Sequence, residues 1–249
     1  MTTLLRDAEL AAAFDHGARA YDRLVALNPG YHAHLRRSAH RLGLPDGGAG
    51  LRVLDLGCGT GASTAALVSV LPKARVVGVD ASPGMLERAR AKRWPPGVSF
   101  VHATAEDLTT ARDVPEEAAG PYDAVFAAYL VRNVTDPDAV LRAVRPLLVP
   151  GGRLAVHDYC LGGRRRDRAV WNAVCAGVVL PLGTLTGDRD LYRHLRRSVT
   201  EFDTARAFAG RLRRAGFDRV RVLPLPGWQT GVTHTFLARR PPYEPGGTR

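Results

Sequence analysis

A glycine-rich stretch, VLDLGCGTGAST at residues 53–64, places three glycines within five positions and an acid, Asp55, two positions ahead of the first glycine. Glycines between a strand and a helix let backbone N–H groups approach a bound ligand closely. A carboxylate at Asp55 would repel a pyrophosphate, but it could receive an ammonium group or order the loop. The stretch therefore predicts a binding loop, either for a dinucleotide or for a ligand without phosphate.

Two further acids extend this pattern. Asp80 ends the next apolar run, RVVGVD, where a carboxylate can accept hydrogen bonds from both hydroxyls of a ribose. Another acid follows the third run, in HATAEDL at 102–108. A ligand with ribose, adenine and an amino acid but no phosphate satisfies all three positions, and S-adenosylmethionine is such a ligand. The dinucleotide alternative stays open, because GCGTGA also matches the dinucleotide fingerprint, which is weak evidence alone.

The elements around these residues alternate between short strands and helices. Strands are expected at RVLDLG, RVVGVD, VSFVHA, YDAVFAAY and GRLAVHDY, and helices at 61–71, from Ser82 as N-cap with Pro83, and at 136–148. This alternation predicts a doubly wound, mainly parallel α/β sheet.

The two ends of the chain follow other patterns. Amphipathic segments at 3–14, 17–27 and 31–43 open the chain, and helices are expected at 165–179, 189–199 and 203–215. DRVRVLPL and GVTHTFLAR then predict two strands in a hairpin-like finish. We expect one domain over 1–249, with an N-terminal helical cap (1–50), a cofactor-binding core (51–160), a helical substrate lid (161–202) and a final helix with hairpin strands (203–240).

The net charge of +11 is concentrated in the last third of the chain, which carries 17 basic and 7 acidic residues. This indicates an anionic membrane or nucleic-acid partner, or else a solvated surface rich in arginine because of coding preference. No apolar run is long enough to span a membrane. The start lacks the basic region of a signal peptide, and Cys58, Cys160 and Cys175 form no CxxC pair, so we expect a cytoplasmic protein with reduced thiols.

Residues 51–160 resemble a class I S-adenosylmethionine-dependent methyltransferase. More narrowly, LVRNVTDPDAVLRAVRPLLVPGGRLAV resembles the UbiE-type C-methyltransferases of ubiquinone and menaquinone biosynthesis, whose hallmarks are RNVTD and LKPGGRL. FDHGARAYDRL, DLYRHLRRSVTEF, RLRRAGFDRV and GVTHTFLARRP extend the similarity over nearly the whole chain. The resemblance implies a Rossmann-like seven-stranded sheet with an antiparallel last strand, and C-methylation of a reduced prenylated quinone of the demethylmenaquinol type.

The residues expected to bind the cofactor lie in the glycine stretch and at the ends of the following strands. They are Asp55, Gly57, Cys58, Gly59, Thr60, Gly61, Asp80, Ala81, Met85, Thr104, Ala105, Glu106 and Ala128. The chain departs from the family at two places: Ala128 stands where a serine is frequent, and HDYC at 157–160 replaces LEFS. Both departures lie at the substrate mouth, so they concern the acceptor more than the cofactor.

Five residues are candidates for catalysis: Arg132, Asn133, His157, Asp158 and Tyr21. Removing a phenolic proton from the acceptor would make the adjacent ring carbon nucleophilic, and a base near neutral pKa would assist. By its chemistry, His157 is the obvious candidate for this base. Alternatively, it is an ordinary histidine packed in the protein interior. Strand alternation allows His157 or Asp158, but not both, to face the pocket. Tyr21 could close the pocket or belong to the core.

Arg132 does not readily deprotonate, so we expect it to stabilise a phenolate while Asn133 orients substrate or water. The alternative is a structural cap on the helix from Asp136. No metal site is expected, because the histidines lack metal-ligand spacing and nearby cysteines.

Other functions remain open at this point: a C- or O-methyltransferase of a soluble aromatic or polyketide, a nucleic-acid methyltransferase, or an NAD-binding protein. Nucleic acid is not expected, because the chain lacks an NPPY-type motif and a dedicated RNA-binding domain. The apolar lid segment flanked by RRRDR and RHLRR suits a prenylquinol at an anionic membrane surface. Alternatively, it is a core helix or a contact between the subunits of a homodimer.

Overall fold

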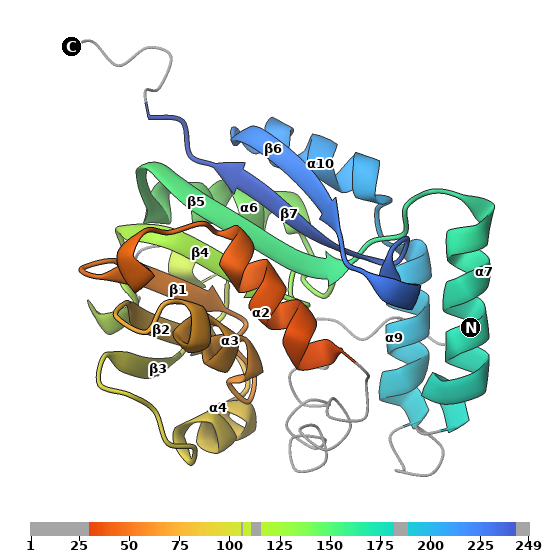
Figure 1. The fold of residues 1–249 in the computed structure, drawn as a ribbon, viewed down its shortest axis with the longest axis horizontal. Helices are drawn as coiled ribbons and strands as arrows, with labels where there is room; N and C mark the ends of the chain where they lie inside the picture. Colours follow the sequence, from red (N-terminus) through yellow and green to blue (C-terminus); the bar gives the residue numbers. More distant parts are fainter. Residues whose placement is uncertain (1–29, 106, 111–115, 182–188, 243–249) are drawn as a thin grey trace.

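A computed structural model of the protein describes residues 30–105, 107–110, 116–181 and 189–242. Within these residues, seven strands form one sheet in the order β3-β2-β1-β4-β5-β7-β6 (Figure 1). The strands are β1 (Arg52–Leu56), β2 (Arg75–Asp80), β3 (Val98–His102), β4 (Tyr122–Ala128), β5 (Leu148–Tyr159), β6 (Asp218–Pro224) and β7 (Thr233–Arg239). Strands β1 to β5 pair in parallel, and β7 is antiparallel to both β5 and β6. The predicted doubly wound sheet with an antiparallel last strand is confirmed.

The helices begin and end close to their predicted limits, and the predicted segments 3–14 and 17–27 lie outside the described residues. The α-helices are α2 (Tyr31–Arg41), α3 (Ala62–Val70), α4 (Pro83–Arg90), α5 (Asp107–Thr110), α6 (Pro137–Leu147), α7 (Arg165–Val174), α9 (Arg189–Glu201) and α10 (Ala205–Arg214). Shorter turns are η1 (Asp46–Gly48), η2 (Glu116–Ala118), η3 (Cys175–Val179), which is a π-helix extending α7, and η4 (Gly227–Gln229). As predicted, Ser82 caps α4, its hydroxyl accepting a hydrogen bond from Met85 N at 3.1 Å.

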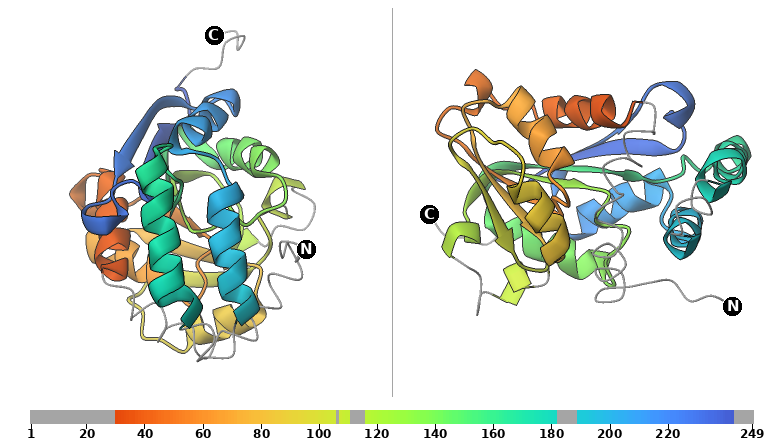
Figure 2. Two further views of the ribbon diagram at one scale, coloured as in Figure 1. Left: turned by 90° about the vertical axis from the view of Figure 1, so that its right-hand side faces the viewer. Right: turned by 90° about the horizontal axis from the view of Figure 1, so that it is seen from below.

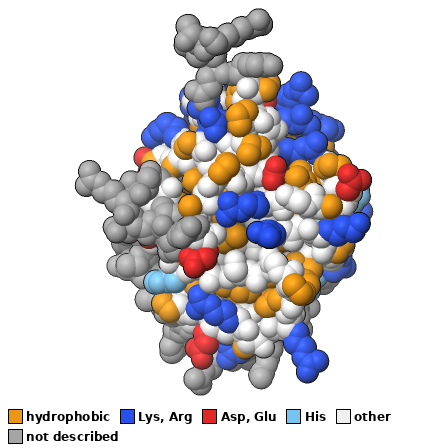
Figure 3. All heavy atoms as spheres, turned by 90° about the vertical axis from the view of Figure 1, so that its left-hand side faces the viewer, with side chains coloured by type: hydrophobic (Ala, Val, Ile, Leu, Met, Phe, Trp, Pro, Cys, Tyr) orange, Lys and Arg blue, Asp and Glu red, His pale blue; other side chains and the backbone are white. Residues whose placement is uncertain are grey.

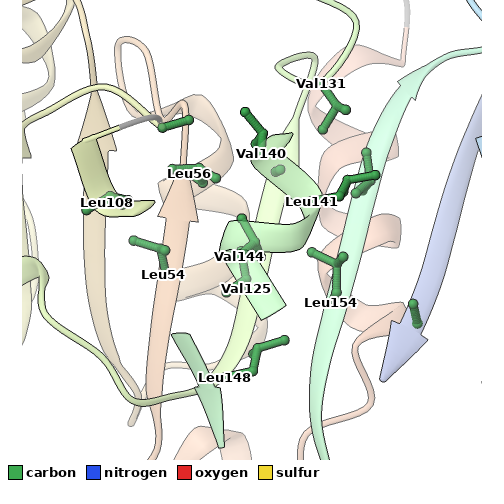
Figure 4. Packing of buried hydrophobic residues seen from close by; sticks show 14 of the residues in the cluster. Leu54, Leu56, Leu108, Val125, Val131, Val140, Leu141, Val144, Leu148 and Leu154 are labelled. Carbon is green, nitrogen blue, oxygen red and sulfur yellow. The ribbon is translucent and has the colours of Figure 1, made fainter. Parts of the chain in front are cut away.

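The two faces of the sheet bury separate hydrophobic clusters. In β1, Val53 packs in the cluster formed with α2 and α3, whereas Leu54 and Leu56 pack in the cluster that includes Val140 and Val144 of α6 (Figure 4). Successive side chains of a strand point to opposite faces, so a strand covered on both sides is apolar throughout. The sheet is therefore a rigid central layer that fixes the positions of the loops at its strand ends.

Helices α7 and α9 stand side by side beyond the carboxyl ends of β4 and β5 (Figures 1 and 2). Trp171 of α7 is buried, packs in one cluster with Tyr159 and Val199, and donates a hydrogen bond from Nε1 to Arg196 O at 3.3 Å. Helices α7 and α9 thus lie over the edge of the sheet where ligands bind in open α/β folds.

Candidate active site

The turn between β1 and α3 carries three glycines in the left-handed backbone region. Gly57, Gly59 and Gly61 have φ angles of 73°, 54° and 88°, which residues with a side chain rarely adopt. A Cβ at Gly57 would lie 3.0 Å from Leu130 and one at Gly61 would lie 2.7 Å from Trp94, whereas one at Gly59 would meet nothing within 4 Å. Gly59 therefore faces the open side of the turn, where a ligand can approach the backbone.

The carboxylate of Asp80, at the end of β2, lies against the same turn. Its Oδ2 accepts a hydrogen bond from Gly59 N at 2.7 Å, and its Oδ1 accepts one from Ser82 N at 2.9 Å. Each oxygen can accept a further hydrogen bond. Burial raises the pKa of Asp80 above its usual range. A carboxylate beside the open side of Gly59 suits the ribose contact expected from the sequence.

Asp55 lies in β1 beneath the turn and has no exposed surface. Its Oδ2 accepts hydrogen bonds from Ser63 Oγ at 2.8 Å and from Thr64 Oγ1 at 2.6 Å, both in the first turn of α3. Burial raises its pKa to about 7. Of the two roles considered from the sequence, these contacts favour ordering of the loop, because the carboxylate has no surface through which to contact an ammonium group.

Other candidate cofactor residues surround the turn. Cys58 and Thr60 are buried within it, and Lys92 Nζ donates a hydrogen bond to Thr60 O at 2.7 Å. Burial raises the pKa of the Cys58 thiol well above its usual value, so this thiol stays protonated. Ala81 follows Asp80 on the half-buried rim, and Met85 is buried in the first turn of α4.

The end of β3 forms the third side of this region. Thr104 N donates to Asp107 Oδ2 at 2.8 Å, and Asp107 N donates to Thr104 Oγ1 at 3.0 Å, which fixes the start of α5. Ala105 is buried between them, and Glu106 lies outside the described residues. Ala128 ends β4 in a half-buried position. The structure thus brings the described candidates to the carboxyl ends of β1 to β4.

Arg132 and Asp158, two catalytic candidates, form one buried ion pair. Arg132 Nε lies 3.2 Å from Asp158 Oδ1, and the two side chains are 3% and 0% exposed. Arg132 N also donates to Asp158 Oδ2, and Tyr159 N donates to Oδ1. Arg132 Nη1 further contacts Ser198 Oγ of α9. The guanidinium is therefore neutralised by the protein and joins the strand end to α9.

Asn133 is held in the same network and does not cap the following helix. Its Oδ1 accepts from Arg132 Nη1 at 3.0 Å, and its Nδ2 donates to Tyr129 O at 2.9 Å. The cap of α6 is Asp136 itself, whose Oδ1 accepts from Ala139 N at 2.9 Å. The alternative of a cap formed by Arg132 and Asn133 is therefore wrong.

His157 points to the opposite face of β5 from Asp158, as strand alternation predicts. Its Nδ1 lies 2.8 Å from Ser38 Oγ of α2, and its Nε2 lies 2.9 Å from the hydroxyl of Tyr129. Burial lowers the pKa of His157 to about 3. A histidine with so low a pKa is a weak proton acceptor, so this environment argues against a general base. Tyr21 lies outside the described residues.

The sequence matches the ubiE/COQ5 methyltransferase family over residues 2–235. The chain belongs to this family. It is 32% identical over 217 residues to the ubiquinone/menaquinone biosynthesis C-methyltransferase UbiE of Syntrophotalea carbinolica, covering 86% of this chain and 88% of that protein. It is 33% identical to a demethylmenaquinone methyltransferase of Clavibacter sepedonicus, covering 85% and 83%.

The fold is also similar to the folds of solved methyltransferases. A S-adenosylmethionine-dependent methyltransferase of Thermotoga maritima superposes with a TM-score of 0.61 at 19% identity, over 92% of this chain and 98% of that one. This ubiE/COQ5 family member is a class I S-adenosylmethionine-dependent methyltransferase. The open side of Gly59 and the carboxylate of Asp80 suit that cofactor.

Tyr129 was not among the candidates from the sequence, although it lies among the aromatic side chains at the carboxyl ends of β4 and β5. Tyr129 follows β4 directly, has a φ of 57°, and stacks on Tyr31 of α2 with ring centroids 5.6 Å apart. Its ring also lies 4.9 Å from that of Tyr159. The available signal was its position one residue after Ala128, at a strand end where ligands bind.

Proposed function

We propose that this methyltransferase C-methylates the ring of a reduced prenylated quinone of the demethylmenaquinol type. The names of its relatives from Syntrophotalea carbinolica and Clavibacter sepedonicus support this class of acceptor. The observation that carries the proposal is a wall of aromatic side chains beside the cofactor turn.

The aromatic wall consists of four residues from four parts of the chain: Tyr31, Tyr129, Tyr159 and Trp171. Tyr31 and Tyr129 stack with an interplanar angle of 11°, and the ring of Trp171 lies 5.1 Å from that of Tyr159. The wall runs from the residue after β4 to α7. Flat aromatic rings pack favourably against such side chains. Tyr129 is the half-buried member of the four, whereas the other three are buried, so a quinol ring would pack at the side of Tyr129.

The proposed division of roles follows from these positions. When bound, S-adenosylmethionine supplies an electrophilic methyl group. Asp80 would hold the ribose, the backbone at Gly59 would approach the amino-acid end, and Thr104 and Ala105 would border the adenine. Alignment of donor and acceptor accounts for much of the catalysis of such a displacement, and the rigid sheet supports that alignment.

The outer face of α7 and η3 suits contact with an anionic membrane that holds the acceptor. Val170 and Val178 are 39% and 52% exposed. Four exposed arginines begin this segment: Arg164, Arg165, Arg166 and Arg168. Apolar side chains beside a cluster of arginines favour a peripheral position on anionic lipid.

On the face seen from the left-hand side of Figure 1, lysine and arginine side chains lie scattered among hydrophobic and acidic ones (Figure 3). In the described part of the chain, the helices are too short or too polar to cross a bilayer. Peripheral contact through α7 is therefore the membrane interaction that we propose.

Calorimetric titration with S-adenosylhomocysteine tests the cofactor site. We expect Asp80→Ala to weaken binding more than about tenfold, because it removes a charge-assisted hydrogen bond of at least about 1.5 kcal/mol. Glu87→Ala, which removes an exposed acid of α4, is the matched control and should bind as the wild type does. Equal binding by Asp80→Ala would remove Asp80 from the site.

An acceptor assay tests the reaction itself. Demethylmenaquinol and soluble phenols are compared as acceptors, and the position of the new methyl group is determined by NMR. Methylation of a ring carbon of demethylmenaquinol is expected. Methylation of soluble phenols alone would overturn the proposal in favour of a soluble aromatic acceptor. Flotation with anionic vesicles should recover the wild type and less of a Val178→Glu variant.

A further inference from the structure

A chain of hydrogen bonds crosses the buried interface between α2 and the strands β5 and β7. It begins at Arg41, whose Nη1 donates to Thr235 Oγ1 at 2.7 Å. Thr235 Oγ1 lies 2.7 Å from Ser38 Oγ, which lies 2.8 Å from His157 Nδ1. His157 Nε2 then lies 2.9 Å from the hydroxyl of Tyr129. Ser38, His157 and Thr235 have no exposed surface, so this chain is shielded from water.

The positive charge of Arg41 sets the donor-to-acceptor direction of this series of hydrogen bonds. Arg41 can only donate, and its positive charge orients the hydroxyl protons of Thr235 and Ser38 away from it. Ser38 therefore donates to His157 Nδ1. Burial lowers the pKa of His157 to about 3, so the ring is neutral and its one proton is on Nε2. That proton is donated to Tyr129.

A second tyrosine lies beside Tyr129, because the ring of Tyr159 is 4.9 Å from its ring. Burial raises the pKa of Tyr129 well above its usual value, and the neighbouring Tyr159 and Tyr31 raise it further. Tyr129 therefore keeps its proton while it accepts a hydrogen bond from His157 Nε2. Donors aligned in this way strengthen one another in a low-dielectric interior. This series of hydrogen bonds therefore ends at the Tyr129 hydroxyl, whose proton remains available to another acceptor.

This end of the chain adjoins the cofactor turn. Tyr129 is followed by Leu130, whose side chain lies 3.0 Å from the place where a Cβ of Gly57 would be. The φ of 57° at Tyr129 is unfavourable for a bulky residue. Such strain persists where the surrounding structure fixes it, and it is frequent at functional sites. Tyr129 N donates to His157 O at 2.7 Å, which holds the strained residue in place.

We propose that Tyr129 and Tyr159 hold the oxygen of the methyl acceptor in its anionic form, as a phenolate or enolate. The acceptor's O–H bond breaks with its electron pair left on oxygen, and the proton passes to solvent. The negative oxygen increases the electron density of the adjacent ring carbon, which forms a bond to the methyl carbon while the methyl–sulfur bond breaks with its electron pair left on the sulfur of S-adenosylhomocysteine. The hydrogen of that ring carbon then leaves to solvent as a proton, which restores the aromatic ring. His157 is a positioning residue that orients Tyr129. This inference rests on the proposed function and specifies the acceptor as an aromatic or enol with an ionisable hydroxyl.

The test measures the ionisation of a bound phenol and not turnover. Para-nitrophenol is titrated against protein saturated with S-adenosylhomocysteine, and its absorbance reports the phenolate. We expect the wild type to bind the phenolate at least about tenfold more tightly than the phenol, the effect of one charge-assisted hydrogen bond. Tyr159→Phe and Tyr129→Phe should lose most of this preference. Tyr122→Phe is the matched control, because its hydroxyl donates to Ala118 O at the other end of β4.

A second variant keeps both tyrosines. Ser38→Ala removes the hydroxyl that joins Thr235 to His157, at a position distant from the acceptor. This variant should reduce the phenolate preference by about twofold to fivefold. This variant decides the outcome if circular dichroism shows that the tyrosine variants are unfolded. Failure of the wild type to prefer the phenolate, failure to bind para-nitrophenol, or an unchanged preference in Ser38→Ala would overturn the proposal. If the wild type does not bind S-adenosylhomocysteine, the proposed function itself is overturned.

Discussion

Breaking the buried ion pair between Arg132 and Asp158 should be one of the most destabilising single changes in this protein. In Asp158→Asn, the guanidinium of Arg132 keeps its charge but loses its carboxylate partner. Its side chain is only 3% exposed, so water cannot replace that partner. The new amide N–H₂ also faces donors, because the backbone N–H groups of Arg132 and Tyr159 both point at the carboxylate in the wild type.

The magnitude follows from this geometry. Removing one partner of a buried ion pair costs about 3–5 kcal/mol, because the remaining charge stays buried without compensation. Single domains have unfolding free energies of about 5–15 kcal/mol. We therefore expect Asp158→Asn to lose about a fifth or more of the free energy of unfolding. Replacing both residues, as in Arg132→Met with Asp158→Leu, should cost less than the sum of the single changes, because no charge is left buried.

Equilibrium unfolding in urea, followed by circular dichroism, measures these differences. The control is Arg197→Ala, which removes the pair between Arg197 and Glu201, whose side chains are 41% and 48% exposed. That change should cost no more than about 0.5 kcal/mol, as expected for an exposed pair on a helix. The reasoning fails if Asp158→Asn stays within about 1 kcal/mol of the wild type, or if the double variant shows simple additivity.

Further predictions concern the cofactor turn. The pKa of Asp55 is raised from 3.8 to about 7, so its contribution to stability is full below about pH 4 and is lost as the pH rises to about 7. The free energy of unfolding, measured in urea, should therefore fall with rising pH by at most about 1.4 kcal/mol per pH unit between these values, and Asp55→Asn should reduce this dependence on pH. Gly61→Ala should destabilise the protein, because its Cβ would lie 2.7 Å from Trp94. Gly59→Ala should lose only about 1 kcal/mol of stability but most of its S-adenosylhomocysteine binding in calorimetry, since its Cβ would enter the open side of the turn; unchanged binding would refute this placement.

The sheet and the cofactor turn could be predicted because their signals are local. Strands such as RVVGVD are short apolar runs that end at an acid or a glycine, and Ser82 is followed directly by Pro83. These patterns reflect burial on both faces and the capping of helix ends. The position of Asp80 beside the turn follows from the pairing of parallel strands, without any knowledge of side-chain contacts.

The contacts at the ends of β4 and β5 could not be predicted in the same way, because they join distant parts of the chain. Ser38 and His157 are 119 positions apart, and nothing near Ser38 indicates that α2 brings its hydroxyl to β5. The pairing of Arg132 with Asp158 depends on the register between β4 and β5. The left-handed backbone of Tyr129 has no sequence signal either, because that conformation is expected mainly at glycine. His157, Asp158 and Arg132 could therefore be predicted as candidates, but their partners could not.

The two polar networks at the end of β5 act on the same short segment. Asp158 accepts hydrogen bonds from the backbone and side chain of Arg132, while His157, on the opposite face of the strand, binds both the hydroxyl and the backbone N–H of Tyr129. Residues 129–132 are thus fixed from both faces of the sheet. Buried polar groups of this kind are often no more stable than well-packed apolar ones, so a gain in stability does not account for them. Their effect is to hold Tyr129 in one orientation next to the turn that carries Gly57, Gly59 and Gly61, and substitutions of His157 or Asp158 should therefore disturb Tyr129 while Gly59 and Asp80 keep their positions.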